Sequence, residues 1–207
     1  PAPEGPALAA ATLQAALDGL DARNWAARPD RVAVLRSALA GRGGVIRKAL
    51  TETAAFDQTA QTLPGPTGES NRLSFHPRGP VLCLGPSAEI AVAQAVQALG
   101  AGCPALIVAP GATVAAEGLA EAGVPVIDFD GVVSPETVAG LRGIAAVAAA
   151  GDSDWTRSIR LALAGRDGPI VPLETRSIAP ERYVVERHLC IDTTAAGGNA
   201  KLLAASA

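Results

Sequence analysis

Residues 81–108 read VLCLGPSAEIAVAQAVQALGAGCPALIV, and this stretch decides the fold. Two short apolar runs, residues 81–84 and 105–108, flank a segment at residues 87–99 in which apolar side chains recur with helical spacing. A run that is apolar at every position is typical of a strand covered on both faces. Two such strands joined by a helix form a parallel βαβ unit. The sequence therefore predicts a parallel sheet with helices on both sides.

The same alternation continues toward the C-terminus. Further strands are predicted at residues 126–129, 144–147 and 170–173, and further helices at residues 114–122, 135–140 and 152–164. We therefore predict an α/β fold over residues 63–176, with a doubly wound, Rossmann-like parallel sheet.

Residues 1–62 have a different pattern and are predicted to form an N-terminal helical segment. Apolar residues fall at helical spacing after residue 12 and again after Pro29, and a third helical run covers residues 45–61. Residues 63–68, LPGPTG, end this region, because Pro lacks an amide donor and Gly has too much conformational freedom.

Two segments alternate between apolar and polar residues, which is typical of half-exposed antiparallel strands. They are residues 72–77 and residues 183–191, and we expect them to pair as a β-flap. Residues 177–207 would then hold the second flap strand and a C-terminal motif. An exposed sheet edge in a native protein is usually covered. We therefore expect a partner at the flap, either another domain or a second copy in a homodimer.

Composition excludes several classes of function. Seventeen Lys and Arg against twenty Asp and Glu give a net charge of -3 without a basic block, so no nucleic-acid partner is expected. No apolar stretch is long enough for a membrane span. Three widely spaced Cys indicate free thiols and a cytoplasmic setting. A chain that lacks Met and any signal-like segment is predicted to be excised from a longer polypeptide.

The turns that follow the predicted strands do not favour a phosphate site. After the first strand, Gly85 is followed by Pro86, which has no amide donor, and Glu89 adds negative charge. We expect Ser87 to be a helix cap there. The turn at Gly151 has a better shape for an anion, but carboxylates at the start of the next helix can satisfy its dipole themselves. Capping is therefore the preferred interpretation at both turns.

No set of residues indicates catalysis or a metal. Cys83 and Cys190 lie in predicted strands and are expected to be buried, whereas Cys103 is the thiol expected to be exposable, with no base nearby in sequence. The two histidines lie on the flap strands, where surface or cross-strand packing is expected. Four alternating charges are expected to form salt bridges: Glu181, Arg182, Glu186 and Arg187.

Residues 63–71, LPGPTGESN, and residues 186–200, ERHLCIDTTAAGGNA, resemble the C-terminal part of the long-form proline utilization A family. The resemblance covers about residues 63–203. It implies a bacterial cytoplasmic, bifunctional parent in which an FAD-dependent proline dehydrogenase passes its product through a channel to an NAD-dependent glutamate-semialdehyde dehydrogenase. The C-terminal domain of this family resembles the nucleotide-binding domain and flap of an aldehyde dehydrogenase without its catalytic domain.

The resemblance also implies that this domain lacks the catalytic and cofactor-binding residues of an aldehyde dehydrogenase. Where related dehydrogenases carry a catalytic Asn, a ribose-binding Lys and the Ser and second Gly of a pyrophosphate turn, this chain has, in order, Ala88, Ala109, Asp152 and Thr156. The segment with the nucleophilic Cys is missing. The implied domain is non-catalytic and holds no cofactor, while FAD and NAD belong to the parent.

The implied role is that of a lid on the substrate channel and a support for the semialdehyde dehydrogenase domain. The residues implied to dock on that domain are Thr193, Thr194, Ala195, Ala196, Gly197, Gly198 and Asn199. Asp192 and Lys201 depart from the family pattern, which has Asn and Ser there. The alternative interpretation is a regulatory nucleotide-binding Rossmann domain, based on the βα alternation and the Gly151 turn.

Overall fold

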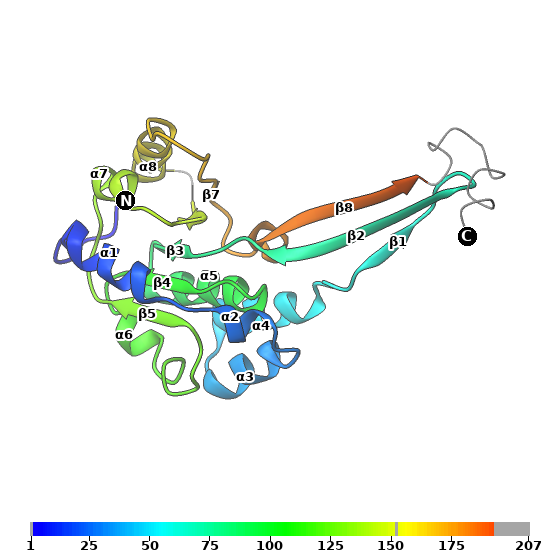
Figure 1. Cartoon of the computed structure of the whole chain (residues 1–207). Helices are drawn as coiled ribbons and strands as arrows, with labels where there is room; N and C mark the ends of the chain where they lie inside the picture. The colour runs from blue at the N-terminus through cyan, green and yellow to red at the C-terminus, as the bar shows by residue number, and fades with distance from the viewer. Residues whose placement is uncertain (1, 152, 193–207) are drawn as a thin grey trace. The chain divides into compact units, whose positions relative to one another are not determined.

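The computed structural model describes residues 2–151 and 153–192, which fall into two compact units (Figure 1). The first unit comprises residues 2–57 together with residues 77–151 and 153–184. The second comprises residues 58–76 together with residues 185–192. The domain boundaries expected after residues 62 and 176 remain a prediction.

The first unit is built on a five-stranded sheet in which all neighbouring strands are parallel. Its strands follow the order β5-β4-β3-β6-β7, so the doubly wound prediction is confirmed. The chain moves outward from β3 through β4 to β5 and then returns to place β6 on the other side of β3. The strands are β3 (Val81–Cys83), β4 (Ala105–Val108), β5 (Val126–Phe129), β6 (Ala146–Ala148) and β7 (Leu173–Glu174).

Helices cover both faces of this sheet (Figure 1). On one face, Leu82 and Leu106 pack in a single core cluster with Leu13 and Leu17 of α1 and with Ile159 of α8. On the other face, α5 contacts β3 and β4 and is itself covered by α4. The helices are α1 (Ala10–Gly19), α2 (Arg23–Ala26), α3 (Arg31–Ala38), α4 (Gly44–Ala55), α5 (Ala88–Gly100), α6 (Ala112–Ala115), α7 (Pro135–Gly140) and α8 (Asp154–Ala164).

Helix α5 is the central helix of the domain, since every residue from 91 to 100 is buried. Its sequence is rich in Ala, and small side chains allow the sheet and α4 to approach its backbone closely from opposite sides. Gly100 shows how close α4 comes, because a Cβ added there would collide with Cγ2 of Thr53. The alanine-rich composition therefore sets the layer spacing.

Several sequence-based boundaries were wrong. The helix expected over residues 45–61 ends at Ala55, and Gln61–Leu63 forms a strand, β1, because pairing with a neighbouring strand satisfies its backbone. The helix expected over residues 114–122 is reduced to α6. Gly118 lies beyond it with φ +91°, where a Cβ would approach the Ala38 carbonyl.

Two strands of the sheet also differ from their predicted bounds. The strand expected at residues 170–173 is reduced to the two residues of β7, since Pro169 and Pro172 cannot donate to a ladder. The strand expected at residues 144–147 is shifted to β6.

The second unit is a three-stranded sheet of β1, β2 (Glu69–Pro77) and β8 (Val184–Asp192), in which β2 is the central strand. Ser74 of β2 donates to the Arg187 carbonyl, 3.3 Å away, and Nε2 of His188 lies 3.2 Å from Oδ1 of Asn71. The expected pairing of the two flap strands is thus confirmed. The 3-10 turn η1 (Pro180–Tyr183) leads from the first unit into β8.

Candidate functional site

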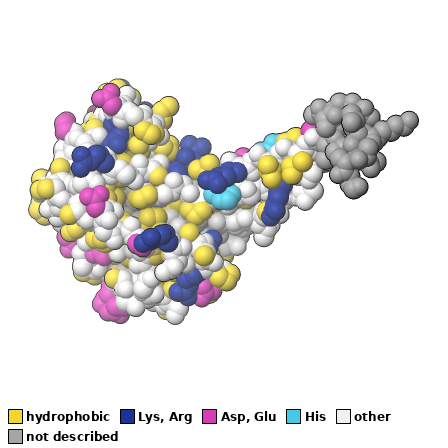
Figure 2. Space-filling view, in the orientation of Figure 1, with side chains coloured by type: hydrophobic (Ala, Val, Ile, Leu, Met, Phe, Trp, Pro, Cys, Tyr) yellow, Lys and Arg dark blue, Asp and Glu magenta, His cyan; other side chains and the backbone are white. Residues whose placement is uncertain are grey.

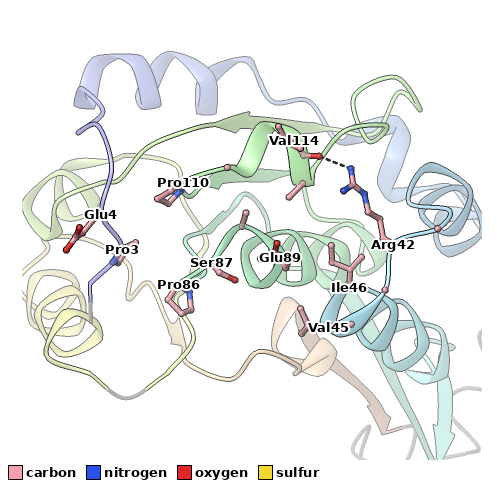
Figure 3. A pocket seen from close by; sticks show the side chains of 16 residues that line it. Pro3, Glu4, Arg42, Val45, Ile46, Pro86, Ser87, Glu89, Pro110 and Val114 are labelled. Carbon is pink, nitrogen blue, oxygen red and sulfur yellow. Dashed lines mark hydrogen bonds between the residues drawn. The ribbon is translucent and has the colours of Figure 1, made fainter.

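The candidate site lies at the carboxyl ends of β3 and β6, where the strand order reverses. Doubly wound sheets bind their ligands in the crevice at this position. Two cavities lie along it: one of about 880 Å³ beside Pro86 and Pro110 (Figure 3), and one of about 360 Å³ beside Pro86 and Gly151. The crevice is therefore present, and its chemistry depends on the groups that face it.

The turn after β3 uses its polar groups internally. Gly85 has φ +80°, and a Cβ there would lie 2.5 Å from the Ser87 carbonyl oxygen, so the turn requires glycine. The amide of Gly85 donates to Oε1 of Gln94 at 3.1 Å. Ser87 caps α5 by accepting from the Ile90 amide at 3.4 Å, as predicted. Since Pro86 has no N–H, this turn offers little to a phosphate.

The turn after β6 is closed in a similar way. The Gly151 amide donates to the Thr175 carbonyl at 2.8 Å. Ser153 and Thr156 form a capping box, in which the Ser153 amide donates to Oγ1 of Thr156 at 2.9 Å and the Thr156 amide to Oγ of Ser153 at 3.3 Å. Asp154 adds negative charge in the first turn of α8, so the capping interpretation is confirmed here too. Asp152 lies outside the described residues.

The remaining two altered positions offer no polar group. Ala88 and Ala109 are both buried, and their methyl groups cannot hydrogen-bond to a ribose. The carboxylates of Glu4 and Glu89 line the larger cavity, with Arg42 as its cation. Arg42 donates to the Val114 carbonyl. These residues are poorly suited to a dinucleotide: the amides of Gly85 and Gly151 have internal acceptors, and the carboxylates of Glu4 and Glu89 would repel a pyrophosphate.

The cysteines correct one part of the sequence interpretation. Cys103 is fully buried rather than exposable, with its thiol 3.2 Å from the Tyr183 carbonyl, and burial raises the pKa of that thiol. Cys83 is buried as expected, and burial raises its pKa as well. Cys190 lies in β8 as predicted, but it is exposed rather than buried. Neither buried thiol is suited to act as a nucleophile.

Both histidines, His76 and His188, lie on the flap sheet, as predicted. Nε2 of His76 lies 3.0 Å from Oγ of Ser74 on the same strand, and His188 contacts Asn71 across strands. Within residues 2–151 and 153–192, no group of three His, Cys, Asp or Glu side chains could hold a metal ion. In the same residues, no helix is long and apolar enough to cross a membrane.

A buried carboxylate that sequence reasoning missed ties β7 to η1. Glu174 is 8% exposed, and its two oxygens accept hydrogen bonds from Arg176 and, at 3.1 Å, from Arg182. Arg176 also pairs with Glu181 at 2.9 Å, so two of the four expected charges do form salt bridges. The spacing of Glu174 and Arg176, two residues apart, is the feature of the sequence that could have indicated this ion pair.

The charge on Glu174 predicts a specific pH dependence. Burial, the largest influence, disfavours its charged form, but hydrogen bonds from Arg176 and the charges of Arg176 and Arg182 leave its pKa below the usual range. A lowered folded-state pKa stabilises the protein above the unfolded pKa of about 4.3, and the stabilisation is lost as pH falls through the folded value.

We therefore expect Glu174→Gln to cost about 1 kcal/mol or less near pH 7, because solvent screens its half-exposed arginine partners. The cost is expected to shrink as the pH approaches 3. Urea unfolding of both proteins between pH 7 and 3 measures it, with the more exposed Glu181→Gln as control. A cost that grows toward low pH would contradict this assignment.

Charged side chains of the first unit are interspersed rather than gathered. On the face drawn in Figure 2, basic and acidic side chains alternate over its surface without a continuous basic patch. The residues expected to dock on another domain, 193–199, lie outside the described residues. The candidate site within the described residues is therefore the crevice beyond β3 and β6, where the amides of Gly85 and Gly151 are bound internally.

Comparison with solved structures defines the class of fold. The chain superposes on a NAD-dependent benzaldehyde dehydrogenase from Corynebacterium glutamicum with a TM-score of 0.64, at 16% identity, over 85% of this chain and 50% of that one. An aldehyde dehydrogenase from Brucella melitensis gives a TM-score of 0.57, at 19% identity, over 76% of this chain and 42% of that one. The chain is thus a domain with the aldehyde dehydrogenase fold.

Sequence relatives then specify the family, although no family model matches. The bifunctional protein PutA is 36% identical in Salmonella typhimurium and 33% identical in Escherichia coli, over 162 residues in each case. A proline utilization A structure with proline bound in remote sites gives a TM-score of 0.63, at 27% identity, over 81% of this chain and 22% of that one. The chain is homologous to proline utilization A. Each curated alignment covers 70% of this chain, which spans 11% of those relatives.

Proposed function

We propose that this chain is the non-catalytic C-terminal domain of a bifunctional proline utilization A, acting as a lid on the substrate channel and as a support for the semialdehyde dehydrogenase domain. The observation that carries the proposal is that the turns lining the crevice bind their own amides internally, in a chain homologous to proline utilization A. Gly85, Gly151 and Thr156 keep the fold of a cofactor site, but their amides bind internal acceptors. In this proposal FAD and NAD are held elsewhere in a cytoplasmic bacterial polypeptide.

The flap supplies a surface for such a role. Strand β8 is an edge strand, and Val185, Leu189 and Ile191 are 37%, 56% and 50% exposed. These residues alternate along the strand, so they share one face of the sheet. This face, which also carries the exposed Arg187, belongs to an edge strand of the described sheet, and such a surface suits a protein partner. The partner proposed is the semialdehyde dehydrogenase domain, either of the same polypeptide or of a second copy in a homodimer.

Residues 193–199 are proposed to extend this contact. Their sequence, TTAAGGN, contains only small side chains, which allow another backbone to approach closely. A bulky side chain in that stretch would then disturb the dehydrogenase site and leave proline oxidation alone.

The test is Gly198→Trp in the full-length polypeptide. We expect NADH formation from added glutamate semialdehyde to fall by about tenfold, because misplaced groups around a reacting centre cost at least that much in rate. Dye-coupled proline oxidation is expected to stay within about twofold. NADH formation from proline, followed in real time, is expected to show a new lag if the channel is no longer closed.

Gly19→Trp is the matched control, since Gly19 ends α1 with no atom within 4 Å of an added Cβ. It is expected to change neither reaction. Equal losses of both reactions in Gly198→Trp, or unchanged time courses, would refute the proposed role.

A further inference from the structure

The first residues of the chain run along the carboxyl edge of the five-stranded sheet. Ala2 and Pro3 line the smaller cavity together with Trp155, at the start of α8 beyond β6. Pro3 and Glu4 line the larger cavity beside Pro86, beyond β3 (Figure 3). The segment thus begins at the reversal point of the sheet.

The next residues continue across the ends of the remaining strands. A Cβ on Gly5 would lie 3.3 Å from Cγ of Pro110, which follows β4. Beyond β5, the Val132 amide donates to the Pro6 carbonyl and the Leu8 amide donates to the Val132 carbonyl, both at 2.9 Å. These bonds form an isolated parallel bridge. Residues 2–8 therefore pass the ends of β6, β3, β4 and β5 in that order.

The sequence of this segment favours an extended conformation that is anchored near both ends. Pro3 and Leu8 are its half-buried residues, and Leu8 packs against the core cluster, so the segment is anchored near both ends. Pro3 and Pro6 fix the backbone dihedral φ and lack an amide donor, which favours an extended conformation and lowers the entropy lost on docking. The residues between the anchors are exposed, so the segment lies on the crevice rather than inside the core.

We propose that residues 2–8, the strap, are an internal ligand of the crevice. The strap lies where doubly wound sheets bind their ligands, and it contacts segments that follow strands on both sides of the reversal point. It reaches β6 and α8 through Ala2 and Pro3, and β5 through its two hydrogen bonds to Val132. The crevice in this domain is thereby a docking site for the chain's own N-terminal segment.

The test is Gly5→Val in the full chain, which places a branched side chain against Pro110 and Val132 without straining the backbone. Hydrogen exchange by NMR is expected to accelerate about tenfold or more at the Val132 amide, as its bond to the strap is lost. Acrylamide quenching of tryptophan fluorescence is expected to rise through Trp155. The other tryptophan, Trp25, is 4% exposed and donates to the Leu99 carbonyl, so it stays shielded.

Gly19→Val is the matched control, because an added Cβ there meets nothing within 4 Å. Leu8→Ala is a second variant that weakens the strap through its anchor, and it is expected to change the same two signals. The Leu106 amide in β4 serves as an internal reference. Unchanged exchange at Val132, or acceleration there no greater than at Leu106, would overturn the proposal.

Discussion

Gln97→Leu is expected to destabilise the full chain by about 3 kcal/mol, since it removes a fully buried side-chain amide that joins α5 to the segment before η1. Nε2 of Gln97 donates to the Ser177 carbonyl at 2.8 Å, and its Oε1 accepts from the Ala179 amide at 2.6 Å. The leucine would leave a carbonyl and an amide of this segment without partners. Each such group costs about 1–3 kcal/mol when buried.

Gln94→Leu is the natural control, one turn away on the same helix and equally buried. Its Oε1 accepts a single bond, from Gly85, and within the described residues its Nε2 has no partner. The leucine removes an unsatisfied donor along with one acceptor, so we expect a loss of about 1 kcal/mol. Urea unfolding followed by circular dichroism compares the two. Equal losses of unfolding free energy in the two variants would contradict a stabilising role for the hydrogen bonds of Gln97 to Ser177 and Ala179.

Gly100→Ala is expected to lower the free energy of unfolding by about 2 kcal/mol, against the usual trend for helices. In an exposed helix the same change stabilises by about 1 kcal/mol, because alanine has the higher helix propensity. At Gly100 the new methyl would collide with Cγ2 of Thr53 on α4, and overpacking of a dense core costs about 1–3 kcal/mol. The collision therefore turns a substitution that usually stabilises a helix into one that destabilises the protein.

In a Thr53→Ala background, Gly100→Ala is expected to stabilise the protein, as the change does in an exposed helix. The Cβ of residue 53 would lie 3.6 Å from the added methyl, which is an ordinary contact once Cγ2 is removed. In that background Gly100→Ala is expected to stabilise, as is Gly19→Ala at the open end of α1. A double-mutant cycle measured by thermal unfolding gives the coupling. A coupling near zero would mean that α4 moves aside without cost.

The apolar strands were predictable because their local sequence agrees with their tertiary setting. Residues 81–84 and 105–108 are apolar at every position, and β3 and β4 lie within them. Ser87 was predictable as a cap for the same local reason. The flap strands were predictable from their alternating apolar and polar residues, because successive side chains of a strand point to opposite faces of the sheet.

Features created by distant contacts were not predictable. Cys103 precedes Pro104 in a loop, which suggested exposure, but it is covered by Tyr183 from 80 residues away. Strand β1 contains only three residues and exists through its pairing with β2. The strap has no hydrophobic periodicity, so nothing in its composition indicated that residues 2–8 would cross four strand ends. Such contacts arise only once the sheet has placed the strand ends together.

The capping box on α8 has a consequence for engineering. Under the proposed function, an engineered dinucleotide site would need glycine in place of Thr156, yet that change alone removes a buried cap from α8 and leaves the Gly85 amide bound to Gln94. Such a substitution is expected to lower the stability of the domain before a bound cofactor could compensate for it. A cofactor site engineered into this domain would therefore require several simultaneous substitutions rather than one.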